Sequence, residues 1–168
     1  MQTISGQVAR MLHEEHTAAL SLLQRLSACL SRHGPITPPK NTDHAVARLL
    51  SELSSAIETE IRIHFKFEED SLFPLLDAFG ERELMDLYLE EHRVIVSLGD
   101  KAAVMARAAR TEGFDAPAWA SFHSVATAFA DRLTGHAEAE EAALLPLLDD
   151  LLDMEADERL AETYQAMR

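Results

Sequence analysis

Two stretches of the chain carry the same arrangement of histidine, glutamate and proline. HFKFEEDSLFPLL begins at His64 and HAEAEEAALLPLL begins at His136, so both read H-x3-E-E followed by a Leu/Phe-Pro-Leu-Leu tail. A histidine and a glutamate four residues apart project from one face of a helix, one turn apart. Each stretch can therefore present an imidazole and a carboxylate side by side.

A second repeat supplies two more histidines. EEHTAAL surrounds His16 and EEHRVIV surrounds His92. In the sequence each of these motifs precedes one of the H-x3-E-E stretches. The pattern therefore predicts that the chain contains two copies of one helical hairpin.

The repeats together define a set of four imidazoles and two carboxylates that could bind metal. Its members are His16, His64, Glu68, His92, His136 and Glu140. Their number and type suit two metal ions, with two imidazoles for each ion and each glutamate bridging. Imidazole with carboxylate favours iron, zinc or manganese over copper(I), calcium or magnesium. The Glu-x-x-His pattern of ferritin-like bundles is missing, because no glutamate stands three residues before any histidine.

The elements that carry these residues are expected to be long helices. Glycine and proline cluster at Gly34–Thr42, at Phe79-Gly80 and at Thr111–Pro117, and the stretches between them are rich in Ala, Leu, Glu and Arg. We expect helices at about 5–33, 43–78, 82–110 and 117–150, and a shorter fifth helix at about 153–167. Each long stretch has an apolar stripe at helical spacing that includes a histidine. The fold class predicted is all-α, an up-down-up-down four-helix bundle with a short C-terminal fifth helix.

The prolines of the two tails should interrupt their helices. Pro74 and Pro146 each lie ten residues beyond a motif histidine. Each should release the carbonyl four residues back, at Asp70 and Ala142, and bend the helix there. The stripes continue past this point to Leu75 and Leu147 at the expected spacing.

Composition excludes several classes of function. The 168 residues carry a formal net charge of −14, which repels polyphosphate and anionic lipid alike, so nucleic acid and membrane surfaces are unlikely partners. The single Cys29 excludes an internal disulfide and a cysteine-type zinc site. No apolar run has the length of a membrane span, so a cytoplasmic location is the default expectation.

The four-helix region, roughly residues 5–150, resembles the hemerythrin-like, or HHE cation-binding, domain family. The resemblance rests on the six residues named above and on both LFPLL-like tails. It implies a single hemerythrin-like domain over residues 1–168 that holds a non-haem di-iron centre. Two iron ions would be bridged by Glu68 and Glu140 and by an oxo or hydroxo group, with zinc or manganese as alternative ions.

The chain departs from the oxygen carriers of that family. Those proteins have a further histidine four residues after the one on the third helix, where this chain has Val96, and an HxxxxD arrangement on the fourth helix, where it offers Glu140. The departures resemble instead di-iron proteins that repair iron–sulfur centres after nitrosative or oxidative stress, and related sensors of oxygen, nitric oxide or iron. Oxygen, nitric oxide and peroxide are the small partners this implies.

The residues leave three functional classes open. The metal could be redox-active or gas-responsive, with or without catalysis. It could instead serve storage, sensing or stability alone, or the bundle could be a metal-free interaction module. Neither self-association nor a protein partner is indicated.

Several residues near the six candidate ligands could support the site or line the core. Glu15, Glu60 and Glu91 are candidates to accept the second N–H of a ligand imidazole. Glu69 and Glu141 lie about 140° around the helix from their histidines and are expected to be solvated. A surface or supporting role is favoured for His13, and core lining for Phe67 and Tyr88. Exposure is expected for His33 and His44, and His123 is too far along its helix to join the centre.

Overall fold

The structure is a computed structural model of the chain and describes residues 5–168. Eight α-helices and two π-helical turns follow one another, and no strand occurs within this range. The elements are α1 (Gln7–His33), α2 (His44–Glu58), α3 (Glu60–Phe67), η1 (Glu68–Leu72), α4 (Phe73–Ala78), α5 (Arg82–Glu112), α6 (Ala116–Ala139), η2 (Glu140–Leu144), α7 (Leu145–Leu151) and α8 (Met154–Met167).

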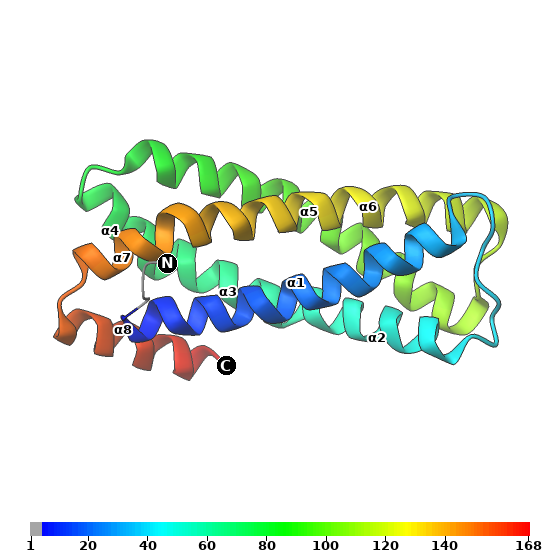
Figure 1. Cartoon of the computed structure of the whole chain (residues 1–168), viewed down its shortest axis with the longest axis horizontal. Coiled ribbons are helices and arrows are strands. Elements are labelled where there is room, and N and C mark those ends of the chain that lie inside the picture. Colours follow the sequence, from blue (N-terminus) through cyan, green and yellow to red (C-terminus); the bar gives the residue numbers. More distant parts are fainter. Residues whose placement is uncertain (1–4) are drawn as a thin grey trace.

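These elements join into four long arms that run side by side (Figure 1). The first arm is α1, the second runs from α2 through α3 and η1 to α4, the third is α5, and the fourth runs from α6 through η2 to α7. The short α8 folds back and packs along α1 (Figure 1). The predicted all-α, up-down-up-down bundle with a short C-terminal helix is confirmed.

Polar caps and glycines set where the arms begin and end. The side chains of Asp43, Asp115 and Asp153 accept hydrogen bonds from backbone N–H groups in the first turns of α2, α6 and α8. A cap of this kind contributes about 1 kcal/mol. Gly34 and Gly113 end α1 and α5 with φ of 62° and 73°, which other residues rarely adopt.

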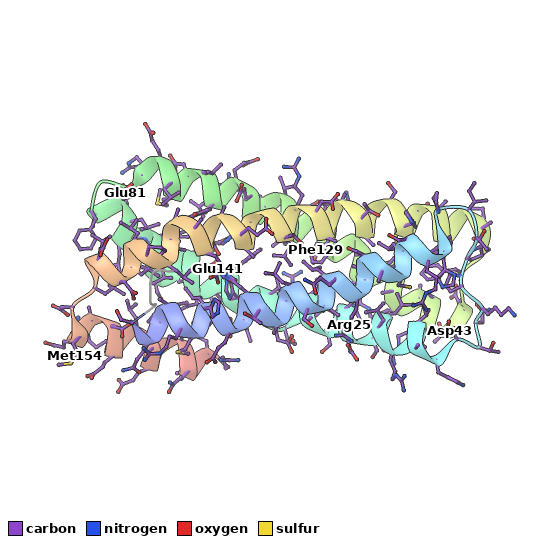
Figure 2. All side chains as sticks on the ribbon, viewed as in Figure 1. Arg25, Asp43, Glu81, Phe129, Glu141 and Met154 are labelled. Carbon is purple, nitrogen blue, oxygen red and sulfur yellow. The ribbon has the colours of Figure 1, made fainter. Side chains whose placement is uncertain are left out.

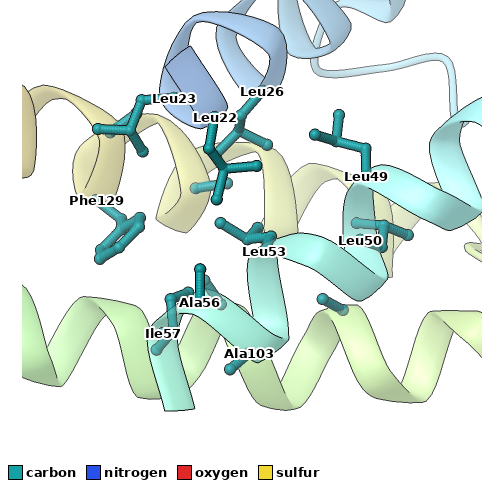
Figure 3. Packing of buried hydrophobic residues seen from close by; sticks show 14 of the residues in the cluster. Leu22, Leu23, Leu26, Leu49, Leu50, Leu53, Ala56, Ile57, Ala103 and Phe129 are labelled. Carbon is teal, nitrogen blue, oxygen red and sulfur yellow. The ribbon is translucent and has the colours of Figure 1, made fainter. Parts of the chain in front are cut away.

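Two apolar clusters fill the bundle, and every arm contributes to both. The larger cluster is built around leucines of α1 and α2, with Phe129 of α6 and Ala103 of α5 (Figure 3). The smaller one contains Leu12, Phe67, Tyr88 and Leu144. Along each arm the motif histidine lies between residues of the two clusters. The polar site is therefore enclosed by apolar packing on both sides.

The two proline-containing arms contain π turns where the sequence predicted simple bends. In η1 the Phe73 N–H bonds the Glu68 carbonyl, and in η2 the Leu145 N–H bonds the Glu140 carbonyl, each five residues back. Pro74 and Pro146 follow directly and have no N–H to continue an α-helical pattern. Such turns insert one residue into a helix and are frequent at functional sites.

The inserted residue shifts the buried stripe beyond each turn. The sequence placed Leu75 and Leu147 on the stripe, but both are only half-buried. Leu76 and Leu148, one residue later, are buried instead. That part of the prediction was wrong because it assumed an uninterrupted 3.6-residue period.

Another unpredicted feature is a break in the second arm. Thr59 separates α2 from α3 with φ −121° and ψ −74°, outside the helical region. The Ser55 carbonyl accepts hydrogen bonds from both the Thr59 N–H at 3.0 Å and the Thr59 hydroxyl at 2.7 Å. The break lies about one turn before His64 and sets the direction of the segment that carries it.

Two helical glycines provide a matched test of the packing. A Cβ on Gly99 of α5 would lie 3.1 Å from the Phe129 ring and 3.2 Å from Ile57, whereas one on Gly135 of α6 would meet nothing within 4 Å. We predict that Gly99→Leu lowers the free energy of unfolding by about 1–3 kcal/mol through overpacking. Gly135→Ala should raise it by about 0.5–1 kcal/mol through helix propensity. Urea unfolding followed by circular dichroism measures both, and equal stability of Gly99→Leu and wild type would contradict the close approach.

Candidate metal centre

The six residues singled out by the sequence converge in the middle of the bundle. His16 comes from α1, His64 from α3, His92 from α5 and His136 from α6, so each arm supplies one imidazole. Glu68 and Glu140 are the first residues of η1 and η2. All six are buried, and both glutamates have no exposed surface.

The six side chains form two overlapping groups of four. In the first, the Nε2 atoms of His16 and His64 lie 3.2 Å apart, and each is 3.1 Å from an oxygen of Glu140 or Glu68. In the second, the Nε2 atoms of His92 and His136 lie 3.1 Å apart, 3.3 Å from Glu68 Oε2 and 3.2 Å from Glu140 Oε1. Each glutamate thus gives one oxygen to each group.

This geometry fits a metal better than it fits hydrogen bonding. The four carboxylate oxygens of Glu68 and Glu140 are buried and have no hydrogen-bond partner. A buried, unpartnered carboxylate costs several kcal/mol. Ligand atoms about 2.1 Å from one ion lie about 3.0 Å apart at a right angle and about 3.4 Å apart in a tetrahedron. The nitrogen–nitrogen and nitrogen–oxygen separations fall in this interval, so the residues present fit two adjacent cations.

Each imidazole is held from outside by a second carboxylate at its Nδ1 atom. Four contacts of 2.7–2.8 Å make up this outer set: His64 with Glu15, His136 with Glu91, His92 with Glu69, and His16 with Glu141. A carboxylate there fixes the tautomer with Nδ1 protonated and Nε2 free to bind metal. Glu141 extends from its arm toward α1 (Figure 2).

The outer contacts link the four arms in a closed circuit. Glu15 of α1 reaches the second arm, Glu69 of that arm reaches α5, Glu91 of α5 reaches α6, and Glu141 of the fourth arm returns to α1. The circuit follows the internal repeat, since each half of the chain contributes one glutamate before a histidine and one after the bridging glutamate.

Part of this outer set was predicted and part was missed. Glu15 and Glu91 occupy the positions expected for partners of ligand imidazoles, whereas Glu60 is exposed and makes no such contact. Glu69 and Glu141 were expected to be solvated. They do point away from the histidine of their own helix, but toward the histidine of the next arm, which single-helix geometry does not reveal.

The C-terminal helix adds two residues that the sequence did not indicate. The Tyr164 hydroxyl of α8 donates to Glu15 Oε2 and lies 3.3 Å from His64 Nδ1. Its ring stacks on Phe67 at a centroid distance of 4.1 Å. Arg168 Nη2 lies 3.2 Å from the other oxygen of Glu15. Only the spacing of Leu160, Tyr164 and Met167 hints that this face of α8 is covered.

Aromatic rings enclose the second group of ligands. Phe65 stacks on His92 with centroids 3.7 Å apart and rings within 6° of parallel. Tyr88 stands edge-on to His136 at 5.5 Å, and its hydroxyl donates to the Ala139 carbonyl at 3.4 Å. Tyr88 and Phe67 are both buried in the smaller apolar cluster, in agreement with the expectation that they line the core.

The other histidines lie outside the two groups. The exposed His13 contacts Glu141 at 2.9 Å and so supports the carboxylate that His16 also uses. His44 is exposed, as expected. His33 is half-buried edge-on to Trp119, which the sequence did not predict. His123 contacts the Leu30 carbonyl at 3.1 Å near the far end of the bundle.

Charges around the imidazoles control their protonation when no cation is bound. Burial alone would lower the pKa of His16, His64 and His92, but the adjacent carboxylates of Glu140 and Glu68 raise each pKa above its ordinary value. Burial would raise the pKa of Glu68, but His64 and His92 hold it well below the usual range. Protons on these three imidazoles therefore supply positive charge beside the carboxylates when no cation is bound.

The pKa values of Tyr164 and Glu15, which are hydrogen-bonded to each other, are shifted in opposite directions. Burial, and then the Glu15 carboxylate, raise the pKa of Tyr164 far above that of a free tyrosine. Burial opposes ionisation of Glu15, but hydrogen bonds from His64 and Tyr164 lower its pKa. Tyr164 thus stays a donor and Glu15 an acceptor over the physiological pH range.

Fold and site together define a metal-binding four-helix bundle. Residues 7–167 match the family model described as the hemerythrin HHE cation-binding domain. The chain belongs to this family. Searches of curated proteins and of solved structures gave no match. Within residues 5–168, no helix combines the length and apolar character needed to cross a membrane.

The outer carboxylates give a first prediction for this site. Removing one should weaken metal binding about 10–100-fold, because the ligand imidazole loses its orienting partner. We predict this loss for Glu15→Ala, and a smaller loss for Tyr164→Phe, which removes only the hydrogen bond to Glu15. Competition with a chromophoric chelator measures the affinity. Glu14→Ala, at an exposed neighbouring position, is the control, and a Glu15→Ala affinity equal to that of the control would contradict the role of the outer contact.

A second prediction concerns pH. In the metal-free fold the raised histidine pKa values give stability that is full below about pH 6.5 and is lost as pH rises through the folded pKa values. Metal binding needs neutral imidazoles, so its stabilisation grows as pH rises. The gap in Tm between metal-loaded and metal-free protein should therefore be large at pH 7.5 and shrink toward pH 5.

Thermal melts with and without chelator measure this gap. Each kcal/mol of metal stabilisation corresponds to about 2–4 °C in Tm for a chain of this size. Melts that coincide with and without metal across this pH range would show that the six residues hold no stabilising cation.

Proposed function

We propose that this chain is a non-haem di-iron protein that acts in the response to oxygen, nitric oxide or oxidative stress, or in the repair of iron centres. The ions are assigned to two positions that share Glu68 and Glu140. His16 and His64 complete one position, and His92 and His136 complete the other. The small partners proposed are oxygen, nitric oxide and peroxide.

One observation carries the proposal: four buried carboxylate oxygens without hydrogen-bond partners, each facing an imidazole nitrogen. Two divalent cations between them would supply the missing positive charge. A mixed nitrogen and oxygen donor set suits iron, and the described site offers no thiolate that would favour copper(I) or an iron–sulfur cluster.

Iron bound there would supply one-electron redox chemistry and a position for a small ligand. The chain's own residues supply the surroundings. Glu15, Glu69, Glu91 and Glu141 hold the protons of the four Nδ1 atoms and fix the imidazoles in place. Phe65 and Tyr88 limit water around the second position.

The number of protein ligands at each position determines whether a bound ion would keep an open position for reaction. The donor set gives each position two nitrogens and two oxygens. A structural zinc site is complete with four such ligands, whereas iron accepts more. Metal identity therefore separates the proposed function from the alternative, a bundle that uses a cation for storage, sensing or stability.

Metal analysis of anaerobically purified protein tests the assignment. We expect two irons per chain and an absorption band that changes with dithionite, oxygen or nitric oxide. Substitution of His16, His64, Glu68, His92, His136 or Glu140 by Ala should lower the bound iron sharply. His33→Ala, His44→Ala and His123→Ala serve as controls and should retain it. A colourless zinc protein that is insensitive to redox agents, or full iron content in the double variant of Glu68→Ala and Glu140→Ala, would refute the proposal.

The reaction with oxygen tests the distinction from oxygen carriers. Val96, half-buried one turn after His92, stands where carriers of this family have a further histidine. We expect the reduced protein to be oxidised by oxygen, with no return of the original spectrum when oxygen is removed. Stopped-flow absorption followed by argon purging measures this, and a spectral change that reverses on purging would contradict the expectation.

A further inference from the structure

A large cavity opens onto the first group of ligands. It has a volume of about 680 Å³ and lies between α1, the α2–α3 segment and α6. His16, His64 and His136 line it. The same cavity is lined by residues of the larger apolar cluster, including Leu22, Leu23, Leu53 and Phe129, which are labelled in Figure 3.

Small side chains create this space. Ala19 lies on the apolar stripe of α1 between His16 and Leu23, where a bundle would normally place a larger residue. Ala56 of α2 and Ala137 of α6 line the walls around it. Ala19 is half-buried, although its neighbours His16 and Leu23 on the stripe are buried, and it lines the cavity.

The volume is far larger than the proposed diatomic ligands require. A water molecule takes about 30 Å³ of liquid volume, whereas pockets for organic molecules typically measure 300–1,000 Å³. Apolar side chains line most of the cavity, with polar groups at its inner end and its rim, which is the usual composition of such pockets.

Charges at the rim favour a neutral molecule. Arg25 of α1 pairs with Glu52 of α2, and Arg168 pairs with Glu15, so both arginines at the rim already have carboxylate partners. Glu60 adds a further negative charge at the rim. Arg25 lies on the side of α1 that faces α2 (Figure 2). An anionic ligand would meet no free cation at this rim.

The rim includes an ion pair between two of the helices that border the cavity. The Arg25–Glu52 pair connects the two helices that border the cavity, and both side chains are about half exposed. An exposed pair of this kind contributes at most about 1 kcal/mol, so it can part for a small molecule at little cost.

We propose that this cavity is a binding site for a neutral, apolar organic molecule of drug-like size, held against α1, α2 and α6 with one end beside His16 and His64. The site goes beyond the proposed function, because most of its wall comes from apolar residues that are not metal ligands. Such a molecule would lie next to the first metal position and would be either the substrate or an effector of that position.

Fluorescence titration with the neutral dye N-phenyl-1-naphthylamine tests the proposal on the full chain, as purified and after metal removal. We expect one dye per chain under both conditions. Ala19→Phe should weaken binding by about tenfold or more, equivalent to about 1.4 kcal/mol, by filling the cavity. Ala56→Leu fills it from the opposite wall and should have the same effect. Ala28→Phe, at an exposed position on α1 outside the cavity, should bind like the wild type.

Thermal melts and circular dichroism show that each variant is folded before it is titrated. No binding by the wild type, or equal binding by both filling variants and Ala28→Phe, would overturn the proposal. Stronger binding of the anionic dye 1-anilinonaphthalene-8-sulfonate would overturn the assignment of a neutral ligand. Metal content is measured separately from dye binding. Protein that binds the dye but no iron would support the cavity and contradict the proposed function. Protein that binds iron but no dye would do the reverse.

Discussion

The burial of two carboxylates is the constraint on which the rest of the structure depends. Glu68 and Glu140 have no exposed surface and no hydrogen-bond donor in the described structure. Such groups are tolerated only where positive charge compensates them, whether from cations or from protonated imidazoles. The four surrounding imidazoles, the π turns that begin at the two glutamates and the apolar clusters on either side all follow from placing that charge at the centre of a helical bundle.

The four outer carboxylates restrain the positions of all four arms relative to one another. Each contact between a glutamate and an Nδ1 atom joins two different arms, and the four contacts close on themselves. Displacing any one arm would therefore disturb its own imidazole and the imidazole of the next arm in the circuit. Tyr164 and Arg168 extend the restraint to the C-terminal segment through Glu15, and the Tyr164 hydroxyl also lies beside His64 Nδ1. The docking of the last helix and the position of one ligand histidine are thus physically coupled.

The sequence predicted the fold class and brought attention to the six central residues, because H-x3-E repeats and apolar stripes are properties of single helices. It did not predict Glu69 and Glu141 as partners, since their role depends on which helix lies next to their own. The π turns were missed because a proline indicates an interruption but not its form, and Leu75 and Leu147 were consequently misplaced by one residue. Tyr164 and the cavity beside Ala19 depend on tertiary packing, which periodicity does not contain.

The partial exposure of the outer carboxylates has a consequence for the movement of protons. Glu15, Glu69, Glu91 and Glu141 are 20–41% exposed, while the imidazoles they contact are at most 8% exposed. Each imidazole thus has its own short path to bulk water through one carboxylate, on the side away from the metal positions. The ligand imidazoles can therefore gain or lose protons through these carboxylates, and water need not enter the apolar interior.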